Sequence, residues 1–188
     1  MLNMNDNIRS WLATFSEPAN RLKLYYTPEA YAKTTLLVHE YHEEIGWNMV
    51  IKPYKDGYQI SDIVVYPQET SPAFIHADES KYGLWKAELP DEIEANLFGH
   101  GHSHVNMGVF ASSVDAQQQF EETKLKGKGF YLFQIWNKSN RVSSFFYDLD
   151  NNILYETPDI DMIVDDTFLT ESYKNVSKLT GVNFCEFE

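Results

Sequence analysis

The sequence predicts an α/β (α+β) fold, in which helices and one mixed β-sheet share a core. Segments with helical spacing of apolar residues interleave with short strand-like segments, and there is no internal repeat, low-complexity tract or long linker. The 188 residues suit a single domain, and a hydrophobic content of 43% with 15% aromatic residues indicates a packed core. We divide the chain into an N-terminal extension (residues 1–20) and one domain (residues 21–188).

The first half of the chain begins with a helical pattern and a strand, followed by a well-marked helix start. Thr27-Pro28-Glu29 combines an N-cap residue, a proline at the first helical position and an acid in the first turn. Asp56-Gly57 is a hairpin signal between two apolar runs. The expected elements are helices at 7–15 and 28–41 and strands at 21–26, 45–52 and 60–66.

The second half contains a cluster of histidines delivered by a buried strand. Ser112 or Ser113 caps the next expected helix, which the segment Gly127-Lys128-Gly129 ends. A closing helix is expected to stop at Gly181. The expected elements are strands at 74–77, 95–98, 131–136, 141–148, Ile153–Glu156 and 162–165, with helices at 79–87, 112–124 and 167–179.

Three of the six histidines, His100, His102 and His104, lie within five residues. On an extended strand, alternate side chains share a face, so His102 and His104 point the same way and Ser103 points the other way. Asp115 follows eleven residues after His104, just inside the expected helix start. Two neutral imidazoles and one carboxylate are the three protein ligands of a catalytic Zn²⁺ site, whose fourth position is left to water. We therefore predict one Zn²⁺ per chain, held by His102, His104 and Asp115.

Other interpretations of the same residues stay open. His102 and His104 can be ordinary core or edge-strand histidines. Ser112 and Asp115 match a capping box, in which an acid at the third helical position answers the capping serine. Capping is compatible with ligation, because a helix start beside the metal would hold Asp115 rigidly.

The remaining histidines are interpreted as non-ligands. His39 and His42 are three residues apart, whereas the zincin helix motif requires two histidines at i and i+4, so we interpret them as helix-end histidines. His100 continues the alternation of the cluster and is expected to pack beside the ligands without joining them. Trp47 and Trp85 are expected to be core aromatics.

The arrangement His102-Ser103-His104, seven residues, Ser112, two residues and Asp115 resembles the motif of the JAMM (MPN+) zinc metalloproteases. The residues Val105-Asn106-Met107 resemble the bacterial and phage branch of that family. The resemblance covers residues 28–148 and implies a deaminase-like α-β-α sandwich with a mixed central sheet. It implies a peptidase or isopeptidase that hydrolyses an amide bond of a protein or peptide substrate, with ubiquitin-like proteins among the candidates.

The family also carries a glutamate upstream, at the start of a strand, and both Glu43 and Glu44 stand in that region. We assign Glu44, because the family's glutamate is usually followed by an aliphatic residue, here Ile45. The resemblance implies that Glu44 takes a proton from the zinc-bound water and delivers it to the leaving amine. It also implies that Ser112 hydrogen-bonds the developing oxyanion. Neighbouring residues on an extended segment face opposite ways, so only one of the two glutamates can approach the metal.

Composition excludes several other classes of function. A formal net charge of −13 repels the phosphates of nucleic acids. The single Cys185 permits no internal disulfide and excludes a deaminase site that needs a Cys-x-x-Cys pair. No apolar run reaches the roughly 18–20 residues of a membrane span, and the first residues lack a secretory signal.

We therefore expect a cytoplasmic protein, from a bacterial or phage-infected cell by the resemblance. The alternative function is a non-catalytic MPN-type scaffold that assembles with partners. Scaffold relatives generally lack one or more ligands, and this chain keeps all of them. The sequence leaves the oligomeric state open.

Overall fold

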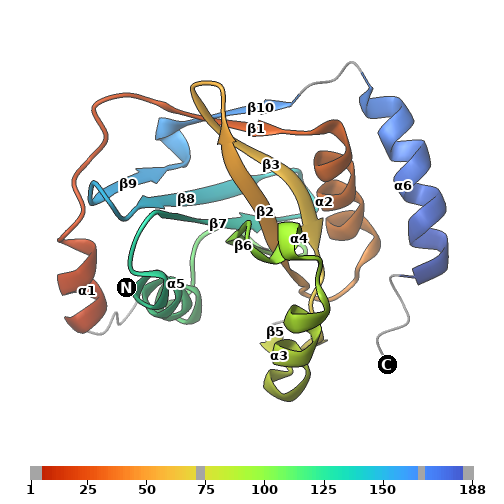
Figure 1. The fold of residues 1–188 in the computed structure, drawn as a ribbon, viewed down its shortest axis with the longest axis horizontal. Helices are drawn as coiled ribbons and strands as arrows, with labels where there is room; N and C mark the ends of the chain where they lie inside the picture. The colour runs from red at the N-terminus through yellow and green to blue at the C-terminus, as the bar shows by residue number, and fades with distance from the viewer. Residues whose placement is uncertain (1–5, 71–74, 165–167, 184–188) are drawn as a thin grey trace.

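The computed structural model describes residues 6–70, 75–164 and 168–183, and its centre is a mixed β-sheet (Figure 1). The strands are β1 Leu22–Tyr26, β2 Gly46–Tyr54, β3 Gly57–Val64, β6 Leu97–Ser103, β7 Phe130–Trp136, β8 Val142–Asp148, β9 Ile153–Glu156 and β10 Ile160–Val164. They form an eight-stranded sheet in the order β10-β1-β3-β2-β6-β7-β8-β9. The pairs β10/β1, β1/β3 and β6/β7 are parallel and the others antiparallel. A separate ribbon pairs β4 Gln68–Thr70 with β5 Ile75–Ala77. The expected class, α+β with one mixed sheet, is confirmed.

Helices cover both faces of the sheet. They are α1 Asp6–Leu12, α2 Pro28–Glu40, α3 Glu79–Glu88, α4 Asp91–Glu94, α5 Ser113–Lys126 and α6 Leu169–Asn183, with a 3-10 turn at Thr157–Asp159. Figure 1 shows α2 beside α6, and α1 beside α5. In the part of the chain that the structure describes, no helix has the length and apolar character needed to cross a membrane.

The N-terminal extension packs on the domain. Trp11 of α1 stacks on Tyr147 of β8, with ring centroids 5.2 Å apart, and meets Phe120 of α5 edge-on at 5.4 Å. Farther along the extension, the backbone of Ser16 pairs with Asn152 and Leu154 beside β9. The extension therefore lies against β8, β9 and α5.

The two faces of β2 and β6 carry different kinds of residue. Trp47 and Met49 of β2 are fully buried in the cluster that includes Leu37 and Val38 of α2. On the same face of β6 stand glycines, and a Cβ built on Gly101 would lie 2.4 Å from Trp47 Nε1. The core side of β6 therefore has no room for side chains at its glycines, and the larger residues of this strand occupy the opposite face.

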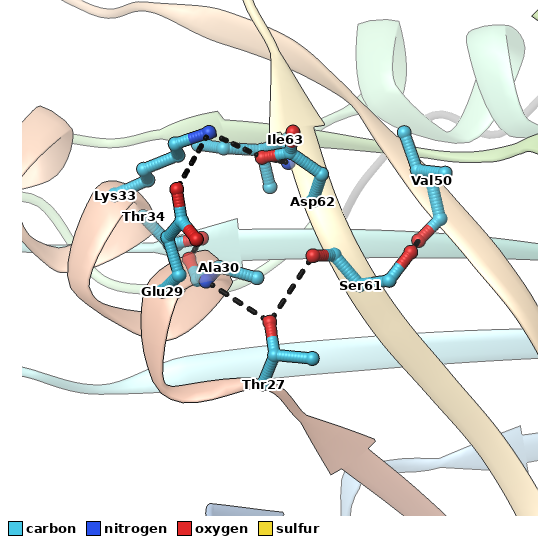
Figure 2. A network of polar contacts seen from close by, with 9 residues as sticks. All are labelled: Thr27, Glu29, Ala30, Lys33, Thr34, Val50, Ser61, Asp62 and Ile63. Atoms are coloured by element: carbon cyan, nitrogen blue, oxygen red, sulfur yellow. Dashed lines mark hydrogen bonds and ion pairs between the residues drawn. The ribbon is translucent and has the colours of Figure 1, made fainter. Parts of the chain in front are cut away.

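The start of α2 is tied to the sheet by polar contacts (Figure 2). The Thr27 hydroxyl accepts a hydrogen bond from Ala30 N at 3.2 Å and donates one to Ser61 O of β3 at 3.1 Å. Lys33 forms an ion pair with Asp62 of β3 at 2.7 Å. The expected N-cap at Thr27 is confirmed, and the same residue positions α2 on β3.

Several expected elements differ from the observed ones. The first helix ends at Leu12 because its last turn tightens into i+3 bonds, in which Thr14 N and Phe15 N donate to Trp11 O and Leu12 O. The strand expected at 60–66 begins at Gly57 and ends at Val64, because β3 pairs with β2 up to the tight turn between them. The helix α4 and the strand β4 were not predicted.

The prediction that Gly181 ends the closing helix is wrong. The helix α6 continues through this residue to Asn183. A glycine inside a helix costs about 1 kcal/mol, but it ends the helix only where the backbone turns to positive φ. Gly127 does make that turn, with φ 71, and closes α5 as expected. The expected positions 74, 165 and 167 lie outside the described residues.

Gly101→Ala tests whether the core face of β6 sets the packing. The added methyl overlaps the Trp47 ring, so we expect a loss of unfolding free energy of about 1–3 kcal/mol. Gly83→Ala is the matched control, because a Cβ there meets nothing within 4 Å and α3 gains about 0.5–1 kcal/mol of helix stability. Urea titration of both variants measures their unfolding free energies. An unchanged unfolding midpoint for Gly101→Ala would contradict the prediction that Trp47 leaves no room for a side chain at position 101.

Candidate metal centre

The strand β6 and the helix α5 bring three potential metal ligands together. His102 lies near the end of β6, His104 follows that strand, and Asp115 is the third residue of α5. His102 Nε2 lies 3.2 Å from Asp115 Oδ1, and His104 Nε2 lies 3.7 Å from Asp115 Oδ2. The three ligand atoms all fall within 4.8 Å of one another, and no other such group occurs in the described residues.

The capping box at the start of α5 is also present, and it orients the same carboxylate. The Ser112 hydroxyl accepts a hydrogen bond from Asp115 N at 3.2 Å, and Asp115 Oδ2 accepts one from Ser112 N at 2.6 Å. Of the two candidate caps, Ser112 is therefore the N-cap. Asp115 can therefore cap the helix and serve as a metal ligand at the same time, because capping fixes the carboxylate while its oxygens face the imidazoles.

The donor types suit a zinc ion, which takes imidazole nitrogens and carboxylate oxygens as ligands. One such atom from each of the three residues lies within 4.8 Å of the other two. His104 Nδ1 lies 2.8 Å from Gly108 O, and a carbonyl oxygen only accepts, so the ring donates its Nδ1 proton to it and turns Nε2 towards Asp115. The arrangement supplies two nitrogen ligands and one oxygen ligand.

A strained turn holds the carbonyl that orients His104. Val105 adopts a positive φ of 47, which is rare for a β-branched residue and costs of order 1 kcal/mol or more. Its N–H donates to Ser103 Oγ at 3.1 Å and its carbonyl accepts from Lys138 N at 2.8 Å. These contacts fix the loop that returns Gly108 O to the imidazole.

The structure brings Glu44 to the metal centre and directs Glu43 elsewhere. The Ile45 carbonyl accepts a hydrogen bond from Ser103 N at 3.0 Å, so residue 44 runs alongside the end of β6. Glu44 is 6% exposed. Glu43 Oε2 accepts a hydrogen bond from Thr70 Oγ1 at 2.6 Å, in the β4/β5 ribbon.

Burial and neighbouring charges set the ionisation of the two carboxyl groups in this centre. Burial raises the pKa of Glu44, whereas its attraction to His104 and His102 lowers it and the charge of Asp115 raises it. Burial opposes ionisation of Asp115 as well, but hydrogen bonds from the two imidazoles outweigh it and hold the pKa of Asp115 well below its usual range. Asp115 is therefore a carboxylate poised for a cation, and Glu44 is a carboxyl group with a tendency to retain a proton.

His100 packs beside the ligands and is absent from the metal-binding group, as expected. Its Nε2 lies 2.9 Å from Tyr66 OH, and its Nδ1 lies 3.4 Å from Gln118 Nε2. Burial lowers the pKa of His100 to about 3, so the ring is neutral. Tyr66 and Gln118 were not identified from the sequence. The position of Gln118, three residues after Asp115 on one helix, is the signal that could have found it.

The other singled-out residues lie away from the centre. His39 Nε2 lies 2.8 Å from Asn140 Oδ1, and His42 is exposed. Trp47 is fully buried in the core, as expected. Trp85 is only partly buried and packs against the rings of Tyr66 and Tyr82, so its assignment to the core is wrong.

The sequence matches no protein-family model and no curated protein. The function of the chain is therefore inferred from the geometry of this centre and from the spacing of its residues.

We predict that the purified protein binds one Zn²⁺ per chain and that His102→Ala abolishes this binding, because the variant removes one of three ligands. His42→Ala removes an exposed imidazole and should leave the stoichiometry unchanged. Elemental analysis after dialysis against zinc measures both. Wild-type protein that takes up no zinc would contradict the assignment of the centre.

Asp115→Asn separates ligation from capping. The amide oxygen still accepts from Ser112 N, so the helix should form normally, while loss of the charge should weaken zinc binding by about tenfold or more. Circular dichroism measures the helix and chelator competition measures the zinc affinity. If zinc affinity stays at the wild-type level, Asp115 acts only as a cap.

Proposed function

We propose that the protein is a JAMM-type zinc-dependent peptidase or isopeptidase, which hydrolyses an amide bond in a protein or peptide substrate. The observation that carries this proposal is the convergence of two imidazoles and one carboxylate within 4.8 Å. The buried Glu44 beside them supports catalysis over a purely structural metal site. Three protein ligands leave the fourth zinc position to water, as catalytic sites require.

The proposal extends to the fold and to the setting of the protein. Helices on both faces of a mixed sheet support assignment to the deaminase-like α-β-α sandwich. The residues Val105-Asn106-Met107 support the bacterial and phage branch of the family, and the single Cys185 is compatible with a cytoplasmic protein. Ubiquitin-like proteins are candidate substrates. Retention of the whole ligand set argues against a non-catalytic MPN-type scaffold.

The residues around the centre can perform the proton transfers of amide hydrolysis. Bound Zn²⁺ would act as a Lewis acid and lower the pKa of a coordinated water towards about 7. Glu44 accepts the proton of the attacking water and returns it to the leaving amine, and its raised pKa brings it closer to that task. The Ser112 hydroxyl accepts from Asp115 N, so its own proton is available to the oxygen of the scissile carbonyl.

Glu44→Gln tests the proposed base. The variant keeps the shape of the side chain and the ligand set, so zinc content should be unchanged, while turnover should fall by about 10²–10⁴-fold. The substrates are a proteome-derived peptide library and a panel of ubiquitin-like fusion proteins, with products read by mass spectrometry.

Glu43→Gln is the matched control, because Glu43 bonds Thr70 outside the centre and its loss should cost little activity. An inactive Glu43→Gln variant together with an active Glu44→Gln variant would assign the general base to Glu43 instead of Glu44. Equal activity in both variants would refute the mechanism.

A further inference from the structure

A cavity of about 1030 Å³ lies between α3 and α5, over β6. Tyr82, Gly83 and Lys86 of α3 form one wall, and Gln118, Glu122 and Lys126 of α5 form the other. We call this cavity the α3–α5 groove. Its volume lies at the upper end of the range of ligand-binding clefts.

One end of the groove adjoins the candidate metal centre, whose own residues do not line the cavity. His100 and Gln118 line it, and they stand two residues before His102 and three residues after Asp115 on the same two elements. The rings of His100 and His102 have centroids 6.0 Å apart. Lys126 lies eleven residues beyond Asp115 on α5, a span of about 16 Å at 1.5 Å per residue, which matches four to five residues of an extended chain.

Exposed apolar side chains stand at both ends of this path. Val114, Gln118, Glu122 and Leu125 recur at helical spacing, so one stripe of α5 runs along the groove, with apolar residues at its two ends and polar residues between them. Val114 is 75% exposed and Leu125 is 90% exposed. Five of the six large apolar side chains that stand exposed in the described residues lie on segments bordering the centre or the groove: Leu84, Met107, Phe110, Val114 and Leu125. Such a concentration marks an interaction surface.

The far end of the groove carries positive charge in an acidic protein. Lys86, Lys126 and Lys128 line it, three of the 15 basic residues in a chain of net charge −13. Lys126 Nζ lies 3.7 Å from the centroid of the Phe98 ring. Lys86 forms an ion pair with Glu94 at 3.3 Å, and the charge of Glu94 also attracts Lys126. Asp150 also lines this end, so the lysines outnumber the acids there.

The middle of the groove is polar. Gln118 Nε2 donates to Glu122 Oε1 at 2.7 Å, and Tyr131 also hydrogen-bonds Glu122. Burial raises the pKa of Glu122, whereas these two hydrogen bonds lower it. The side chain of Glu122 is therefore already engaged by Gln118 and Tyr131, between the metal centre and the lysines.

We infer that the α3–α5 groove binds an extended segment of the substrate, with apolar residues next to the scissile bond and an acidic side chain four or five residues away from it. This inference rests on the proposed peptidase function and names its substrate class. The position of the groove next to the metal centre gives the register. The exposed Met107, Phe110 and Val114 beside the centre account for the apolar residues, and the lysines account for the acidic one.

The test measures peptide binding without turnover, in zinc-loaded Glu44→Gln protein. The probes are fluorescein-labelled, C-terminally amidated peptides Leu-Phe-Leu-Ala-Glu-Glu, Leu-Phe-Leu-Ala-Gln-Gln and Gly-Gly-Gly-Ala-Glu-Glu, followed by fluorescence anisotropy. The first peptide should bind at least about fivefold more tightly than either of the others, since each lacks one part of the match. Equal affinity of all three would overturn the inference.

Charge reversal locates the acidic subsite. Lys126→Glu should weaken the first peptide by about fivefold or more and remove its advantage over the glutamine peptide. Lys124→Glu is the matched control, because it makes the same charge change on the same helix while its side chain lies over the Phe120 ring, outside the groove. Equal losses in the two variants would show a long-range charge effect and overturn the inference.

The two proposals fail in distinguishable ways. Groove-dependent binding in Glu44→Gln protein, together with no cleavage of any library peptide by the wild type, would keep the groove and refute the peptidase. Library cleavage with no acidic preference, unchanged in Lys126→Glu, would keep the peptidase and overturn the groove.

Discussion

The contact between Trp47 and Gly101 is the constraint on which the metal centre depends. Trp47 is fully buried, and its ring occupies the space that a side chain at position 101 would need. Met49 makes the same demand on Gly99, where a built Cβ would lie 2.9 Å from its Cε. Because β6 alternates, its core face can carry only glycine at these positions, and the imidazoles of the strand emerge together on the other face. The alternation of side chains along β6 therefore places glycines against the core on one face and the imidazoles of His100 and His102 on the other.

The helix α5 depends on the same centre from the other side. An acid at the third position of a helix stabilises the helix by capping and by its interaction with the helix dipole. Asp115 does so while its carboxylate oxygens also contact the imidazoles of His102 and His104. A carboxylate that is buried and lowered in pKa is costly unless a cation or donors compensate it. The first turn of α5 therefore couples the stability of the helix to the charge in the centre, and the axis of α5 then fixes the direction of the α3–α5 groove.

Local patterns predicted most of this arrangement, and contacts remote in sequence account for the rest. The Thr27 cap, the positive φ of Gly127 and the alternation of β6 are set by nearby residues, so the helices α2 and α5 and the shared histidine face could be read from spacing. The side on which Glu44 lies depends on pairing between Ile45 and Ser103, which no local pattern encodes. The hydrogen bond between Tyr66 and His100 joins segments far apart in the chain, and so does the groove between α3 and α5. Gly181 shows that a glycine does not end a helix where its backbone stays helical.

The loop after His104 is held in place by contacts from another part of the fold. The β7–β8 turn bonds the loop of the strained residue Val105 twice: Lys138 N donates to Val105 O, and Asn137 Nδ2 donates to Met107 O at 2.7 Å. That turn is anchored in turn by the bond between Asn140 and His39 at the end of α2. The tautomer of His104 is thus fixed by a chain of contacts reaching across the sheet to α2, on its other face. The strain at Val105 therefore accompanies an imidazole whose orientation is fixed in advance by the fold.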